Sequence, residues 1–172
     1  MKPTRAMSRI RMADLLTPER IVPMLKAADK QQVIEKLSSL AAAQTGLNEE
    51  CVRRAVLTCE DLTTFGVGRG IAIPHGLVGG ITGPVGAFAR LKRPVDFGAA
   101  DGRPADLVLL LLAPKTEAGI LLPALSCVAR RLRDREVAKH LRADTSAEAA
   151  HVILTTDSWR GHDPHPDWKN AA

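Results

Sequence analysis

The feature that most constrains the fold is the apolar run LVLLLLA at residues 107–113, which Pro114 ends. The run has the length of a β-strand, and it lacks the alternation of apolar and polar residues that a half-exposed strand shows. A strand of this kind is covered on both faces, which requires helices on both sides of its sheet. At 172 residues with 45% hydrophobic content, the chain is long enough for one domain with its own core. We therefore expect a single α/β domain.

Apolar periodicity and capping residues place the other elements around that strand. Pro23 indicates that the first strand lies at an edge of the sheet, because proline cannot donate a ladder hydrogen bond. Asp29 precedes a helical pattern, and Thr145 with Glu148 forms a capping-box signature before the last helix. Pro94 is expected in a polar connection. The predicted strands cover 20–25, 71–73, 85–91 and 107–113, and the predicted helices cover 30–44, 49–59, 117–132, 135–141 and 146–155.

The stretch TTFGVGRGIAIPHGLVGG at residues 63–80 contains the strongest candidate for a functional site. Its first three glycines permit backbone angles that are closed to other residues, so the chain can turn sharply and bring amide N–H groups close to a bound anion. The stretch has no Gly-Lys-Ser/Thr, and its glycines do not continue into a GxGxxG motif followed by a helix. The spacing therefore predicts neither a Walker loop nor a Rossmann loop.

His75 follows a short apolar segment in that stretch. Ile71–Ile73 indicates a buried strand, and Pro74 ends it because proline fixes its own φ and restricts the residue before it. We expect His75 at the mouth of the strand, on a rigid backbone, with its imidazole free to meet a ligand. The alternative, a turn histidine without a function, stays open on spacing alone.

The charge distribution is modestly basic. The net charge is +5, and much of the excess comes from residues 1–11 and 130–142. This suits an acidic partner surface, or equally an ordinary solvated face. Tyrosine is absent, and Phe and Trp are few, so the chain lacks the aromatic set on which bases stack. We expect no nucleic-acid partner.

Cysteine usage and apolar runs bear on the compartment. Cys51, Cys59 and Cys127 are an odd number without paired spacing and fall in predicted helices, which fits a reducing compartment. The first residues lack the apolar core of a signal peptide, and the longest apolar run is too short to cross a bilayer. We expect a cytoplasmic protein with no membrane contact.

The two ends of the chain lack periodicity, and we expect residues 1–11 and 157–172 to be disordered. The C-terminal stretch contains His162, Asp163, His165 and Asp167, which are metal-ligating residue types. Structural zinc sites take their ligands from ordered segments, and nothing here holds these side chains in place. No metal site is predicted.

The loop with the pattern G-x-G-x-G-I-A-I-P-H-G resembles the phosphorylation-site loop of the IIA proteins of the bacterial phosphoenolpyruvate-dependent phosphotransferase system, mannitol/fructose class. Within that family the chain is most similar to the nitrogen-regulatory branch. The likeness runs from about Met12 to about Thr156, which delimits an EIIA type-2-like domain over 12–156. It includes the segments LAAAQTGL, ARLKRPVDFGAADGRPADLVLLLLAP and LSCVARRLRD.

This resemblance implies a three-layer α/β/α fold with a mixed central sheet and no cofactor. It also implies that His75 accepts a phosphoryl group from a small histidine phosphocarrier protein of the HPr or NPr type. The two charge states would then bind different regulatory partners, such as potassium-transport control or stringent-response proteins. The residues expected to support the phosphoryl group are Gly66, Gly68, Arg69, Gly70 and Gly76.

The chain departs from the family pattern at two positions. Cys59 stands where the family usually has an arginine, and Leu121 stands where it usually has a second histidine. Arg69 is the nearest candidate to replace the missing positive charge. Cys59 itself is interpreted as a small buried residue or, alternatively, as an oxidisable thiol, which would require a lowered pKa.

These departures leave two functions open. The first is a phosphocarrier that is consumed and regenerated, and the second is a regulatory binding module that has kept the fold but has weak or no phosphotransfer. The sequence offers no further catalytic set, so an enzyme with independent turnover is not predicted.

Overall fold

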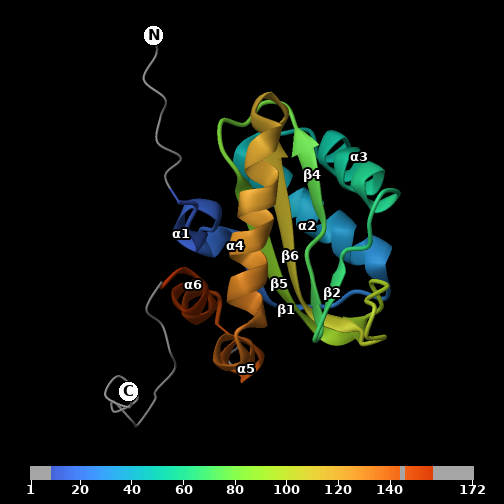
Figure 1. Cartoon of the computed structure of the whole chain (residues 1–172), viewed down its shortest axis with the longest axis vertical. Coiled ribbons are helices and arrows are strands. Elements are labelled where there is room, and N and C mark those ends of the chain that lie inside the picture. The colour runs from blue at the N-terminus through green and yellow to red at the C-terminus, as the bar shows by residue number, and fades with distance from the viewer. Residues whose placement is uncertain (1–8, 144–145, 157–172) are drawn as a thin grey trace, which may run out of the picture.

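A computed structural model describes residues 9–143 and 146–156, and the chain is shown in Figure 1. The expectations for residues 1–8 and for residues 157–172, which include His162, Asp163, His165 and Asp167, lie outside the described part. The strands are β1 Ile21–Leu25, β2 Gly66–Gly68, β3 Ile71–Ala72, β4 His75–Val78, β5 Val85–Val95 and β6 Ala105–Pro114. The helices are α1 Met12–Leu15, α2 Lys30–Thr45, α3 Glu49–Glu60, α4 Leu121–Arg133, α5 Arg135–Ala143 and α6 Ala147–Thr155, with short 3-10 helices η1 Pro18–Arg20 and η2 Lys115–Ile120.

The six strands form one mixed sheet in the order β1-β5-β6-β3-β2, with β4 also paired to β6. β5 and β6 run antiparallel, whereas β1 is parallel to β5, and β3 and β4 are parallel to β6. β1 lies at one end of this order, which confirms the edge position predicted from Pro23. The long apolar run becomes β6, whose residues 107–113 are all fully buried.

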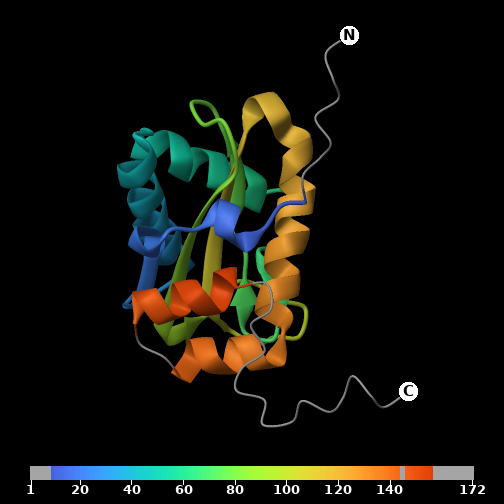
Figure 2. The ribbon, with the colours of Figure 1, turned by 90° about the vertical axis from the view of Figure 1, so that its left-hand side faces the viewer.

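The sheet has a separate apolar core on each face. Along β6, the odd-numbered leucines from Leu107 to Leu111 join one core, and the residues between them join the other. The first core lies beneath α4, α5 and α6, and the second lies beneath α2 and α3. Figure 2 shows the strands standing between α2 and α3 on one side and α4 on the other. The three-layer α/β/α architecture is thus confirmed.

Helix starts follow local capping chemistry. The carboxylate of Asp29 accepts from the N–H of Gln32 at 2.9 Å, as the sequence predicts for the start of α2. For α6 the prediction from Thr145 was wrong: Ser146 is the N-cap residue, and its hydroxyl accepts from the N–H of Ala149 at 2.9 Å. Either residue type can cap a helix, so only the backbone path decides which one does.

The end of β5 and the structure of the glycine-rich stretch both differ from prediction. Pro94 lies inside β5, which continues to Val95, because the pairing with β6 shifts register between Arg90 and Val95 and does not need every N–H there. In the glycine-rich stretch, β2 and β3 form a hairpin with Arg69 and Gly70 at its tip, at φ 58° and 76°. A two-residue hairpin turn requires such left-handed angles at both positions.

Within the described residues, no helix is long and apolar enough to cross a membrane. The same part of the chain contains no cluster of three or more His, Cys, Asp or Glu side chains placed to hold a metal ion.

Candidate functional site

His75 is the first residue of β4 and is half-buried. The segment that pairs with this side of β6 is interrupted at Ile73 and Pro74, which separate β3 from β4. The carbonyl of Pro74 still accepts from the N–H of Leu111 at 2.9 Å, so the interruption stays attached to the central strand. Pro74 therefore ends β3 as predicted, but His75 opens a further strand.

Two contacts orient the imidazole of His75. Its Nδ1 lies 2.8 Å from the carbonyl oxygen of Ile73, and its ring meets the ring of Phe65 edge to face, with centroids 5.1 Å apart. A carbonyl oxygen only accepts hydrogen bonds, so Nδ1 carries the proton in this arrangement. In the neutral ring, Nε2 is then unprotonated and holds the lone pair that a nucleophile uses.

Gly76 allows α3 to approach this strand closely. A Cβ atom at Gly76 would lie 2.9 Å from the carbonyl carbon of Ala55 and 3.0 Å from the backbone nitrogen of Val56. Backbone atoms within a helix cannot move aside as a flexible side chain can. Only glycine at this position lets α3 pack this closely against the strand that His75 opens.

Cys59 lies on the last turn of α3, close to the same strand. Burial raises the pKa of its thiol, against a smaller lowering by a hydrogen bond from the backbone of Leu77, which lies just beyond His75 in β4. The raised pKa disfavours the thiolate, so the interpretation of Cys59 as a small, partly buried residue is favoured over that of an oxidisable thiol. Position 59 therefore lies against β4, the strand that His75 opens.

Leu121 opens α4 and packs against the core beneath that helix. Leu111, the partner of His75 in the β4–β6 register, belongs to the same core. Where the family usually has a histidine, this chain thus places an apolar side chain on the same face of the sheet as Leu111.

Arg69 and Gly70, at the hairpin tip, do not lie next to His75. β3 pairs Ile71 with Leu107, and β4 pairs His75 with Leu111, and residues 107 and 111 of one extended strand lie about 13 Å apart. Arg69 sits beyond Ile71, at the far end of β3, where its side chain lines a different pocket. The structure therefore does not bear out Arg69 as a replacement for the missing arginine.

Several backbone N–H and carbonyl groups of this hairpin form hydrogen bonds with neighbouring segments. The N–H of Gly66 donates to the carbonyl of Phe97, and the N–H of Arg69 donates to the carboxylate of Asp101 at 2.8 Å. The carbonyl of Gly70 accepts from two N–H groups at the start of β6. Of the predicted support residues, Gly76 directly follows His75, Gly66 directly follows Phe65, whose ring contacts His75, and Gly70 lies at the hairpin tip. Lys115, a cation just beyond the end of β6, the strand that pairs with β4, is exposed and begins η2.

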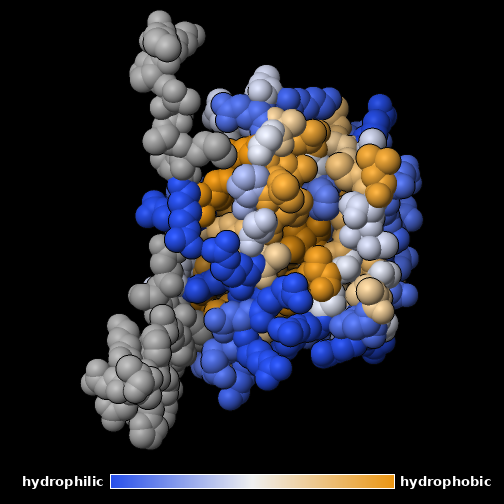
Figure 3. Space-filling view, viewed as in Figure 1, coloured by the Kyte–Doolittle hydropathy of each residue, from blue (hydrophilic) through white to orange (hydrophobic). Residues whose placement is uncertain are grey.

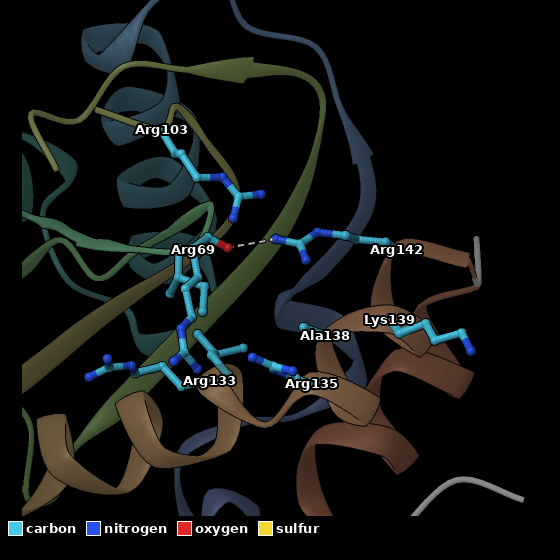
Figure 4. Close-up of a pocket in the computed structure, with 9 residues that line it drawn as sticks. Arg69, Arg103, Arg133, Arg135, Ala138, Lys139 and Arg142 are labelled. Atoms are coloured by element: carbon cyan, nitrogen blue, oxygen red, sulfur yellow. Dashed lines mark hydrogen bonds between the residues drawn. The ribbon is translucent and has the colours of Figure 1, made fainter. Parts of the chain in front are cut away.

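Sequence analysis missed a basic pocket at the far end of β3. The pocket has a volume of about 540 Å³ and lies between the hairpin tip, the loop before β6 and the α4–α5 corner (Figure 4). Its lining includes the side chains Arg69, Arg103, Arg133, Arg135, Lys139 and Arg142. The basic character of residues 130–142 was a visible signal, but only the fold brings Arg69 and Arg103 to it.

Apolar side chains gather on the face shown in Figure 3, in front of the sheet and beside α4, with hydrophilic residues below them. Among the exposed large apolar residues of the chain are Leu62 at 83% exposure, Leu122 at 72% and Val67. Leu62 and Val67 flank Phe65, whose ring contacts His75, and Leu122 lies on the first turn of α4.

Comparisons with known proteins agree with this architecture. Residues 14–156 match the family described as "Phosphoenolpyruvate-dependent sugar phosphotransferase system, EIIA 2". A nitrogen regulatory protein of Bradyrhizobium diazoefficiens is 46% identical over 143 residues, which are 83% of this chain and 94% of that protein.

Two solved structures place the fold among known proteins. The crystal structure of the nitrogen regulatory protein IIA-Ntr from Neisseria meningitidis has a TM-score of 0.78 and 32% identity, covering 84% of this chain and 99% of that one. The complex of enzyme IIAMTL with phosphorylated enzyme IIBMTL from Escherichia coli includes a chain with a TM-score of 0.67 and 26% identity, covering 81% and 96%. The chain therefore belongs to the EIIA type-2 family of the phosphoenolpyruvate-dependent phosphotransferase system, and within it is similar to nitrogen regulatory proteins.

Proposed function

We propose that this protein is a phosphocarrier of the nitrogen-regulatory phosphotransferase branch, with Nε2 of His75 as the phosphoryl acceptor. The observation that carries the proposal is the hydrogen bond between Nδ1 of His75 and the carbonyl of Ile73, which leaves Nε2 as the unprotonated ring nitrogen. Family membership supports it, because the matched region includes the whole loop around His75.

The transfer itself needs little covalent chemistry from the protein. Nε2 of His75 attacks the phosphorus of a phosphohistidine on a carrier protein, the new P–N bond forms as the donor's P–N bond breaks, and the donor histidine leaves with the electron pair. The proton on Nδ1 stays in its bond to Ile73, which offsets positive charge that develops on the ring. Phe65 restricts rotation of the ring by its edge-to-face contact.

The apolar residues beside the site suit a protein partner. Leu62 and Leu122 are large and exposed, and exposed apolar groups near a reactive side chain are typical of a docking surface. A histidine phosphocarrier protein of the HPr or NPr type is the donor that fits the family. The solved complex of a similar IIA protein with a phosphorylated partner supports transfer between two docked proteins.

The charge that phosphorylation adds to His75 would regulate the binding of partner proteins. Phosphorylation of His75 adds up to about two negative charges to a mainly apolar surface, which is enough to make or break a docking contact. The regulatory partners expected for this branch are potassium-transport control and stringent-response proteins.

A second function is favoured by the residues around the ring. Cys59 and Leu121 are uncharged, and the recorded ring contacts of His75 in the described part of the chain are a carbonyl and a phenyl ring. A phosphoryl group would therefore meet less positive charge than the family pattern provides. The alternative is a regulatory module that binds its partners with weak or no phosphotransfer.

Intact-mass analysis distinguishes these functions. The protein is incubated with phosphoenolpyruvate, the first enzyme of the system and its histidine carrier protein, and the mass is recorded before and after mild acid. We expect one acid-labile phosphoryl group. His75→Ala is expected to remove it, whereas His140→Ala is the matched control, since Nδ1 of His140 also meets a main-chain carbonyl, that of Glu136.

A phosphoryl group that persists in His75→Ala would contradict the assignment of the acceptor. No phosphorylation of the wild-type chain, with donors that phosphorylate another IIA protein in the same assay, would favour the binding module.

A further inference from the structure

We propose that the basic pocket defined above binds a small organic anion that carries two or more phosphoryl groups. This site lies at the opposite end of β3 from His75, and the pocket lining does not include His75. The proposal is therefore independent of phosphoryl transfer, and it stands or fails whichever function of His75 holds.

The first argument is the excess of positive charge. Six cationic side chains line the pocket, and they outnumber the two carboxylates that contact them, Asp101, which attracts Arg103, and Asp106. Among the described residues, the ion pair recorded for these six is that of Arg142 with Asp106, at 2.9 Å. Arg133, Arg135 and Lys139 therefore add charge that this pair does not neutralise. Like charges held this close repel one another, and a bound polyanion relieves that repulsion.

The second argument is that the pocket is held in shape. The guanidinium of Arg142 donates to both carboxylate oxygens of Asp106 and, at 3.0 Å, to the carbonyl of Arg69. This bridge joins α5 to β6 and to the hairpin tip, and Figure 4 shows the bond from Arg142 to Arg69 at the tip. The carboxylate of Asp101 accepts from the backbone N–H groups of Arg69 and Arg103, which holds both cationic residues at the mouth. A preformed site loses less entropy when a ligand binds.

The third argument concerns the class of ligand. Ile71, Leu132 and Ala138 form a buried apolar floor, so the apolar surface that a ligand can reach comes mainly from the aliphatic stems of the arginines and Lys139 above it. Guanidinium groups bind phosphoryl oxygens in pairs, and apolar surface beside them accommodates a ring or a short carbon chain. A volume of about 540 Å³ lies within the range of small-molecule sites. Together these features fit an organic diphosphate or triphosphate better than inorganic phosphate.

Isothermal titration with adenosine 5′-diphosphate as the probe tests the proposal, with inorganic pyrophosphate in a parallel titration. We expect saturable binding of one adenosine diphosphate per chain, tighter than pyrophosphate because the ring meets the apolar surface. The double variant Arg103→Gln with Arg135→Gln removes one cation from each side of the pocket and should weaken binding by about tenfold or more. Both side chains are exposed, so the fold should tolerate the change.

The matched control is Arg54→Gln with Arg130→Gln, which removes the same charge from exposed positions outside the pocket. It should bind the probe as the wild type does, and circular dichroism checks both doubles for folding. Lys139→Glu provides a second variant with the same expected direction of effect.

Three results would overturn the proposal. One is the absence of saturable binding by either probe. Another is an equal loss of affinity in both double variants, which would indicate attraction to overall charge. The third is tighter binding of a short single-stranded oligonucleotide with the same sensitivity to the pocket variants, which would identify the pocket as part of a nucleic-acid groove.

Discussion

The two ends of β3 offer opposite environments to an anion. At one end, His75 presents a nucleophilic nitrogen beside Phe65, with uncharged Cys59 and Leu121 at the positions where the family usually has an arginine and a histidine. At the other end, six cationic side chains line a pocket that contains no comparable nucleophile. A phosphoryl group would be bonded at the first end, and a free phosphorylated molecule would be attracted to the second.

A cationic residue that is close to His75 in the sequence need not be close to it in the folded protein. Arg69 precedes His75 by only a few residues, yet the hairpin turns it toward α4 and α5. The intervening strand is short but extended, so every residue adds about 3.3 Å of separation. Under the proposed phosphocarrier function, His75 would therefore depend on its hydrogen bond to Ile73 and on groups that a partner protein brings.

The largest expected effect is that mutations at the two ends of β3 impair different properties, phosphorylation at one end and binding of the probe at the other. His75→Ala should abolish the acid-labile phosphoryl group and leave the affinity for adenosine diphosphate unchanged. Arg103→Gln with Arg135→Gln should weaken probe binding and leave the rate of phosphorylation unchanged. Intact mass and isothermal titration on both variants measure this. A variant that loses both properties while remaining folded would show that the two ends act as one site.

The next effect concerns the charge missing at the His75 end. Cys59→Arg combined with Leu121→His should raise the rate of phosphorylation by about tenfold or more, because each new donor can stabilise the transferring oxygens. The rate is measured by quenched intact-mass time courses with the carrier protein as donor. Cys51→Arg, an exposed position on the same helix, is the control for added charge. An unchanged rate in the double variant would mean that the present site already supplies what transfer needs.

A smaller effect tests the packing that distinguishes the His75 end. Gly76→Ala should lower the free energy of unfolding by about 2 kcal/mol, since the new methyl group meets the backbone of α3. Gly79→Ala is the control, because nothing lies within 4 Å of a Cβ there. Urea titration followed by circular dichroism measures both. Equal stability of the two variants would show that α3 can shift away from β4 without loss.

The smallest effect tests how the hairpin tip is held at the basic end. Hydrogen bonds from the backbone N–H groups of Arg69 and Arg103 lower the pKa of Asp101. A lowered pKa in the folded state means that the ionised carboxylate stabilises the fold above its unfolded pKa of about 3.9. This contribution is lost as the pH falls through the lower, folded value.

Asp101→Asn should therefore lower the urea midpoint slightly at pH 7 and reduce the loss of stability on acidification below about pH 4. Urea titrations across that range, on the wild type and the variant, check the sign. An identical acid dependence for both proteins would exclude a stabilising role for the Asp101 carboxylate at the hairpin tip.

Much of the fold follows from local patterns. The unbroken apolar run of β6 predicts cover on both faces, and Pro23 predicts an edge strand, because each pattern limits the hydrogen bonds or surfaces available to its own segment. The start of α2 is predicted for the same reason, whereas the helix predicted over 117–132 begins as the 3-10 helix η2 and becomes α4 only at Leu121. Pro94 misled the prediction, since its strand tolerates proline through a register shift that depends on β6, a distant partner.

By itself, the sequence determined the three layers, because an unbroken apolar strand needs cover on both faces, and the motif that contains His75 carried the resemblance to the family. The tertiary structure alone decided which ring nitrogen is unprotonated, that α3 brings Cys59 to the strand of His75, and that Arg69 faces away. It also brought residues 69, 103 and 133–142 together into one pocket. Strand register and helix packing determine such long-range contacts, and no local spacing encodes them.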